Sequence, residues 1–140
     1  MNENRILFVD LDGTLIKEDL SDLAFINSLK TNPLRLIIYL IVFFFKGKSY
    51  LKEKISKNYI IPIEKLNFNS AALDYIRDVK NRHRVVYLIS GSHQLLVDQI
   101  DKHLRIFFES FGTNIDFNMV GKNKVAVSYT HLTLPTNACV

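Results

Sequence analysis

Apolar and polar residues follow one another along the chain in blocks that predict alternating strands and helices. Two short, unbroken apolar runs, Ile6–Val9 and Val85–Ile89, each stop at a polar residue next to a glycine-containing turn, as strands buried on both faces do. Ile106–Phe111 is a third candidate strand. Apolar residues at helical intervals predict helices over Asp19–Lys30, Lys48–Lys57, Asn69–Arg82 and Gln94–Leu104. This alternation predicts an α/β fold, in which helices pack on a parallel sheet.

The segment Leu34–Phe45 is apolar on all sides and carries a single charge, on Arg35. It is shorter than the ~20 residues of a membrane-spanning helix, so we expect a core or interfacial helix that something else must cover. Five lysines and one acid, Glu53, follow between positions 46 and 57. This basic window is either a solvated helix face or a surface that meets anionic lipid, which attracts such lysines.

Composition limits the classes of protein and the compartments that fit. A chain of 140 residues, of which 48% are hydrophobic and 23% charged, has the length and composition of one globular domain with a buried core. The net charge of +4 is mild and most basic residues alternate with acids, which argues against a nucleic-acid partner. The lone cysteine, Cys139, excludes an intramolecular disulfide framework, and residues 1–10 contain no signal-peptide core. We therefore expect a cytoplasmic location.

Candidate chemistry lies in the turn that follows the first predicted strand. Asp10 and Asp12 stand two residues apart there, and Gly13 permits a sharp bend, so both carboxylates can approach one site at the carboxyl end of the strand. Such a pair suits Mg²⁺, which prefers hard oxygen ligands. One carboxylate can then attack phosphorus while the other exchanges a proton with the leaving group. A merely solvated turn is the alternative for any pair of this spacing.

The full string DLDGTL after an apolar strand resembles the first motif of the haloacid dehalogenase (HAD) superfamily, most of whose members are phosphohydrolases. The resemblance implies that Asp10 is the nucleophile and that Asp12 is the general acid/base. It also implies Mg²⁺ as cofactor, held by Asp10 and by Asp12, whose backbone carbonyl faces the ion. Thr14 would support the loop that binds phosphate.

The later motifs of the superfamily are matched in part. Ser90 and Gly91, after the second predicted strand, resemble the motif whose hydroxyl binds the transferring phosphoryl group beside a helix N-terminus. A serine read alone in this position is more often a helix cap, so the assignment of Ser90 depends on that of Asp10. Lys124 fits the charge-stabilising lysine better than Lys122, and an ordinary surface lysine is the alternative. The later acids that complete the Mg²⁺ shell have no counterpart, because Asp116 precedes the lysines. We therefore expect little phosphatase activity from this chain, and more from a longer parent protein.

The chain divides by composition into residues 1–125, an incomplete HAD-like domain, and residues 126–140. A helical cap covering approximately residues 17–82 would be inserted after the first strand, giving a truncated Rossmannoid parallel sheet with a cap. The 18 basic and 14 acidic residues all precede position 126, and the string SYTHLTLPTN in the tail resembles translated sequencing adapter. We expect a non-native tail without a partner strand, the alternative being a natural β-rich tail over Val127–Leu134.

A closer resemblance covers most of residues 1–125. The segments Val9–Ile16, Asn32–Leu34 and Phe45–Lys52 are similar to the HAD-like domain fused in front of UbiA-family polyprenyl transferases, which are integral membrane enzymes. The resemblance implies that a phosphorylated small molecule or a polyprenyl-linked phosphate is the substrate. It also implies a place at the cytoplasmic face of the membrane, where Leu36–Phe45 would touch the bilayer or a fused membrane domain. A non-catalytic module that docks on such a domain is the alternative function.

Overall fold

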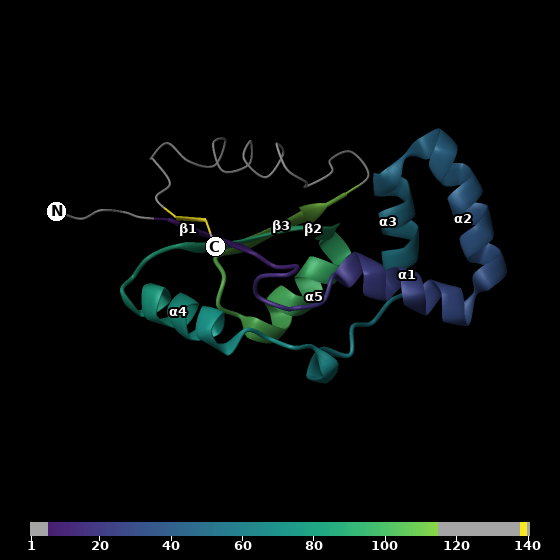
Figure 1. Cartoon of the computed structure of the whole chain (residues 1–140). Coiled ribbons are helices and arrows are strands. Elements are labelled where there is room, and N and C mark those ends of the chain that lie inside the picture. Colours follow the sequence, from purple (N-terminus) through teal and green to yellow (C-terminus); the bar gives the residue numbers. More distant parts are fainter. Residues whose placement is uncertain (1–5, 115–137, 140) are drawn as a thin grey trace.

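A four-stranded parallel sheet forms the centre of the computed structural model, which describes residues 6–114 and 138–139 (Figure 1). The strands are β1 (Leu7–Asp10), β2 (Val86–His93), β3 (Glu109–Thr113) and β4 (Ala138–Cys139), and their order across the sheet is β3-β2-β1-β4. In the register of the two inner strands, Leu7 pairs with Val86 and Asp10 with Ile89. The predicted α/β fold with a parallel sheet is confirmed.

Both faces of β1 are buried, which explains why its sequence is an unbroken apolar run. Leu7 and Val9 point into the main core, which the helices complete. Phe8 points to the opposite face and joins a smaller cluster, where its ring stacks on that of Tyr87 at 5.3 Å between centroids. Burial on both faces makes the end of β1 a rigid platform for the residues that follow it.

Among the described residues, five α-helices cover the sheet or extend from its edge. They are α1 (Leu20–Thr31), α2 (Pro33–Lys46), α3 (Lys48–Ser56), α4 (Ser70–Asn81) and α5 (Gln94–Leu104), with a short 3₁₀ turn, η1 (Ile63–Lys65). Four of these α-helices confirm helices that the apolar spacing predicts, and α2 confirms the helix expected over the apolar segment Leu34–Phe45. Asp19 caps α1 by accepting hydrogen bonds from the backbone N–H groups of Ser21 and Asp22, as expected for an acid at this position.

The first three helices form an extension at one end of the sheet (Figure 1). Pro33 separates α1 from α2 because proline starts a helix readily but cannot continue one. Gly47, with a φ of +84°, makes the turn between α2 and α3 in a backbone region that favours glycine. Helix α3 packs on α1, α2 and β2, whereas α2 lies at the outer rim.

Helix α4 lies within the range predicted for the cap but packs with the sheet. Its buried residues Ala72, Ile76 and Val79 belong to the same core as Leu7 and Leu88 of the inner strands. The core continues without a break into the buried residues of α1, α2 and α3. The cap boundaries at about residues 17 and 82 stay a prediction.

Strand β2 continues further than its apolar run predicts. It extends through Ser90, Gly91 and Ser92 to His93, with an irregular register against β3 between Ile89 and His93. Helix α5 follows at once, and the His93 side chain caps it by accepting a hydrogen bond from the N–H of Leu95. The alternative that Ser90 caps the helix is therefore wrong, because Ser90 lies inside the strand, three residues before the cap.

Strand β3 begins later than predicted, at Glu109 rather than Ile106. Ile106 and Phe107 pack against the core from the connection before the strand. At its far end β3 approaches the start of α5 so closely that a Cβ at Gly112 would lie 2.8 Å from the Cα of Gln94. A glycine is needed there because no side chain fits.

Two residues of the predicted tail take part in the sheet. Ala138 and Cys139 pair in parallel with Leu7 and Phe8, on the side of β1 opposite to β2. The expectation that the tail has no partner strand is therefore corrected. An open strand edge presents unpaired N–H and C=O groups, which an extended segment of the chain satisfies. Whether residues 126–140 are native stays a prediction.

We predict that Ile76→Ala lowers the free energy of unfolding by about 2–5 kcal/mol, because it opens a cavity between α4 and the sheet. Ile76 is fully buried, whereas Ile60 is 85% exposed and serves as the matched control. Ile60→Ala should change stability by no more than about 0.5 kcal/mol. Equal losses in urea unfolding of the two variants would contradict the packing of α4 described above.

Candidate active site

The two aspartates of the first motif lie where β1 ends. Asp10 is the last residue of the strand, and the next N–H, that of Leu11, still donates to the carbonyl of Ile89 at 3.1 Å. The chain then turns back on itself at Gly13, whose φ is +75°. The N–H groups of Leu15 and Ile16 both donate to the carbonyl of Leu11 at 3.1 Å. The loop that carries Asp12 is thus fixed by main-chain hydrogen bonds and by buried leucines.

Three parts of the chain converge on the carboxylate of Asp12. Its Oδ1 accepts a hydrogen bond from the N–H of Leu20 at 2.9 Å, at the first residue of α1. The hydroxyl of Ser90 donates to Oδ2, and the hydroxyl of Ser92 lies 3.1 Å from both oxygens. The Ser92 hydroxyl is also 3.1 Å from that of Ser21 on α1. Asp12 therefore joins the loop after β1, the start of α1 and the end of β2.

Burial and hydrogen bonding shift the pKa of Asp12 in opposite directions. Burial raises the pKa of Asp12 above the ordinary value of 3.8, and the charge of Asp19 raises it further. The hydrogen bonds from Leu20, Ser90 and Ser92 favour the carboxylate and lower the pKa, but they do not outweigh burial. Asp12 consequently holds a proton at a higher pH than a solvated aspartate does, which suits a general acid.

A cation from the helical extension reaches the same edge of the sheet. The ammonium group of Lys52 on α3 donates to the carbonyl of Gly91 at 2.6 Å, and the hydroxyl of Thr113 donates to the same carbonyl at 2.9 Å. Lys52 is half-buried and lies 39 positions before Gly91 in the chain. The segment from Ser90 to Ser92 is thus held both by β3 and by α3.

The predicted site residues are brought together in part. Asp10, Asp12, Ser90 and Gly91 all lie at the carboxyl ends of β1 and β2. Thr14 lies in the loop after β1, where its backbone carbonyl accepts a hydrogen bond from the side chain of Asn69, and its supporting role stays a prediction. Lys124 lies outside the described residues, as does Lys122.

Three residues at this site were not predicted to belong to it. Ser92 could have been found, because alternate residues of a strand share a face and Ser90 and Ser92 are two apart. Ser21 lies at the start of the helix predicted over Asp19–Lys30, where a serine is typical of a helix cap, so no local signal assigns it to the site. Lys52 carries no local signal, since its place beside Gly91 depends on how α3 folds back on the sheet.

The oxygen ligands that Asp10 and Asp12 offer fit Mg²⁺, provided that substrate and water supply the remaining ligands of the ion. The two ligands that the motif resemblance implies, the carboxylate of Asp10 and the backbone carbonyl of Asp12, are both hard oxygen donors, while Leu20, Ser90 and Ser92 already hold the Asp12 side chain. Mg²⁺ is usually bound by one or two carboxylates with waters and substrate phosphate. Within the described residues, no group of three or more His, Cys, Asp or Glu side chains could hold a metal ion by itself.

Comparison with known sequences gives a relative but no family. No protein-family model matches the chain. The uncharacterized protein y4nM of Sinorhizobium fredii is 31% identical over 119 residues, which are 85% of this chain and 23% of that protein. The chain therefore spans about a quarter of the length of the curated relative that it matches.

Solved structures agree on the fold. A HAD family hydrolase from Salmonella enterica serovar Typhi has a TM-score of 0.61 at 13% identity, over 97% of this chain and 55% of that one. A substrate-bound phosphoserine phosphatase has a TM-score of 0.58 at 16% identity, over 94% and 71%. A phosphoserine phosphohydrolase-like protein from Francisella tularensis has a TM-score of 0.56 at 14% identity, over 96% and 76%. The chain has the α/β fold of HAD hydrolases, as the motif at Asp10 implies.

Proposed function

We propose that the chain carries the nucleophile and phosphate-binding part of a Mg²⁺-dependent phosphohydrolase that works through an aspartyl-phosphate on Asp10. One observation carries the proposal: a buried Asp12 that accepts hydrogen bonds from Ser90, Ser92 and the start of α1, directly after Asp10 at the end of β1. A merely solvated turn would not bury and triply bond its second carboxylate.

In the proposed reaction, a carboxylate oxygen of Asp10 attacks phosphorus and forms a new O–P bond. The bond from phosphorus to the leaving oxygen breaks, and Asp12 gives that oxygen its proton. Water then attacks the aspartyl-phosphate, passes a proton back to Asp12, and releases phosphate and the Asp10 carboxylate. Bound Mg²⁺ supplies positive charge that stabilises the phosphoryl oxygens. The raised pKa of Asp12 supports its role as the acid of the first step.

Substrate and location are finer parts of the same proposal. The segments similar to UbiA-family fusions support a phosphorylated small molecule or polyprenyl-linked phosphate as substrate, and a place at the cytoplasmic face of the membrane. The match to only 23% of the curated relative is compatible with a longer protein. A non-catalytic module docking on a membrane prenyltransferase domain is the second candidate, favoured by the exposed apolar side chains of α2. A module without catalysis has no chemical need for both Asp10 and Asp12.

The first prediction concerns the nucleophile and the acid. With an aryl phosphate and Mg²⁺ at single turnover, the chain should release the aryl alcohol slowly and form an acid-stable phosphoryl adduct on Asp10, detected by mass spectrometry. Asp10→Asn should abolish both signals, because an amide is not a nucleophile. Asp12→Asn should slow release by about 10²–10⁴-fold. Wild-type protein without any adduct or release would favour the non-catalytic module.

A second prediction concerns Lys52, whose charge should help to hold an anionic substrate beside Gly91. Lys52→Gln is expected to lower kcat/KM for the aryl phosphate by between about tenfold and about a hundredfold, the range for one charge-assisted contact. Lys54→Gln, two positions further along α3, removes the same charge without that contact and should leave kcat/KM unchanged. Equal effects of the two substitutions would show that Lys52 acts only through its general positive charge and not through a specific contact with the substrate.

A third prediction follows from the raised pKa of Asp12. Above the ordinary pKa of 3.8 the folded chain retains a proton that the unfolded chain has released, so stability falls as pH rises through this window. Asp12→Asn cannot titrate. The free energy of unfolding of the wild type minus that of Asp12→Asn, measured in urea without added metal, should therefore fall as the pH rises above the ordinary pKa of 3.8. A difference that rises with pH would show that the folded state favours the carboxylate.

A further inference from the structure

Helix α2 presents a continuous apolar face outward. Its residues lie at intervals of three, four, seven, ten and eleven from the first, which places them on one side of a helix. Each is between 53% and 85% exposed. We call this face the α2 stripe: Leu34, Ile37, Ile38, Ile41, Phe44 and Phe45. An apolar patch of this size on one helix usually marks an interaction surface.

The α2 stripe does not pack against the hydrophobic core of the described residues. The opposite side of α2 already packs inward, where Leu36 is 2% exposed and Leu40 touches the main core. Helix α2 is the outermost element of the extension in Figure 1. Its 14 residues form a helix about 21 Å long, which is shorter than the ~30 Å thickness of the hydrocarbon core of a bilayer. No helix among the described residues is long and apolar enough to cross a membrane.

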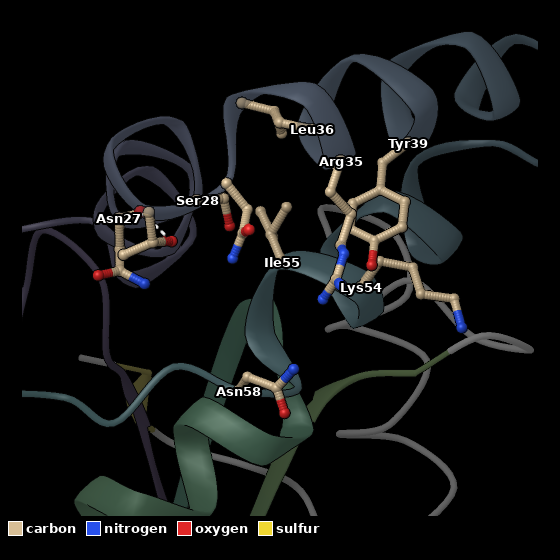
Figure 2. A pocket seen from close by; sticks show the side chains of 10 residues that line it. Asn27, Ser28, Arg35, Leu36, Tyr39, Lys54, Ile55 and Asn58 are labelled. Carbon is tan, nitrogen blue, oxygen red and sulfur yellow. Dashed lines mark hydrogen bonds between the residues drawn. The ribbon is translucent and has the colours of Figure 1, made fainter.

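Positive charge flanks the stripe. Residues 23–51 contain no Asp or Glu but include Lys30 and Arg35 near the start of α2 and Lys46 and Lys48 near its end. A cavity of about 240 Å³ between α1, α2 and α3 continues this pattern, because Arg35 and Lys54 line it and no acidic residue does (Figure 2). The extension therefore combines an exposed apolar helix face with cations at both ends of that helix.

We propose that the α2 stripe lies in the interface of an anionic lipid bilayer, with its apolar side chains between the acyl chains and its flanking cations at the headgroups. Interfacial helices have this combination of one apolar face and basic flanks. A second copy of the chain fits less well, because both ends of α2 are cationic and would meet like charge in either orientation. The proposal deepens the membrane location that forms part of the proposed function, but it does not depend on phosphate hydrolysis, since no stripe residue belongs to the site.

The experiment is flotation of the full 140-residue chain with phosphatidylcholine vesicles that contain or lack phosphatidylserine. We expect the chain to float with the phosphatidylserine vesicles at low salt and to be released as salt screens the cations. Phe44→Ser should weaken this binding by about tenfold or more, because a phenylalanine side chain leaves the apolar layer. Ile60→Ser is the control, since Ile60 is as exposed as Phe44 but lies outside α2.

The charge contribution is tested separately. Replacing both Lys46 and Lys48 by Gln should weaken binding to phosphatidylserine vesicles by about fivefold for each lysine. The same exchange at Lys65 and Lys102, which are exposed on other elements, should leave it unchanged. Circular dichroism of each variant is the check that the helical fold is kept.

Two results would overturn the proposal. One is the absence of flotation with either vesicle, or flotation that Phe44→Ser leaves unchanged. The other is self-association, measured by sedimentation, that Phe44→Ser abolishes while no variant changes lipid binding. This result would show that the α2 stripe is an interface between copies of the chain.

Discussion

The rest of the site depends on the burial of one carboxylate, that of Asp12. A buried charge is costly unless hydrogen bonds compensate it, and Asp12 obtains these from Leu20 of α1 and from Ser90 and Ser92 of β2. The loop after β1, the first helix of the extension and the second strand must therefore stay in register for the group to be tolerated. The same arrangement leaves the pKa of Asp12 raised, so Asp12 keeps its proton to a higher pH than a solvated aspartate does, which supports its proposed role as the acid.

The helical extension reaches the site through a small number of polar contacts. Ser21 meets Ser92, and Lys52 meets the carbonyl of Gly91, so α1 and α3 each contact the end of β2. Helix α2 lies at the outer rim of the extension (Figure 1), and the side chains of its apolar stripe are exposed. The extension thus has an inner side that completes the site and an outer side suited to another surface.

Most of the fold could be predicted from the sequence because the local patterns of apolar residues and helix caps match the burial found in the structure. The runs at Ile6–Val9 and Val85–Ile89 are unbroken since both strand faces are covered, and the helices follow apolar spacing and caps such as Asp19. The end of β2 could not be predicted, because SGSH has no strand propensity and is held extended by β3 and by Lys52. Lys52 itself could not be assigned to the site, because tertiary folding alone brings it to Gly91.

The protonation of Asp12 is the most direct test of this account. Carbon-13 NMR of the aspartate carboxyl groups, with Asp12→Asn to assign the resonance, gives its pKa in the folded chain. The account predicts a value above 3.8, and a further rise in Ser92→Ala because a donor to the carboxylate is lost. A pKa at or below 3.8 in the wild type, or no change in Ser92→Ala, would contradict the claim that burial against the two serines governs the site.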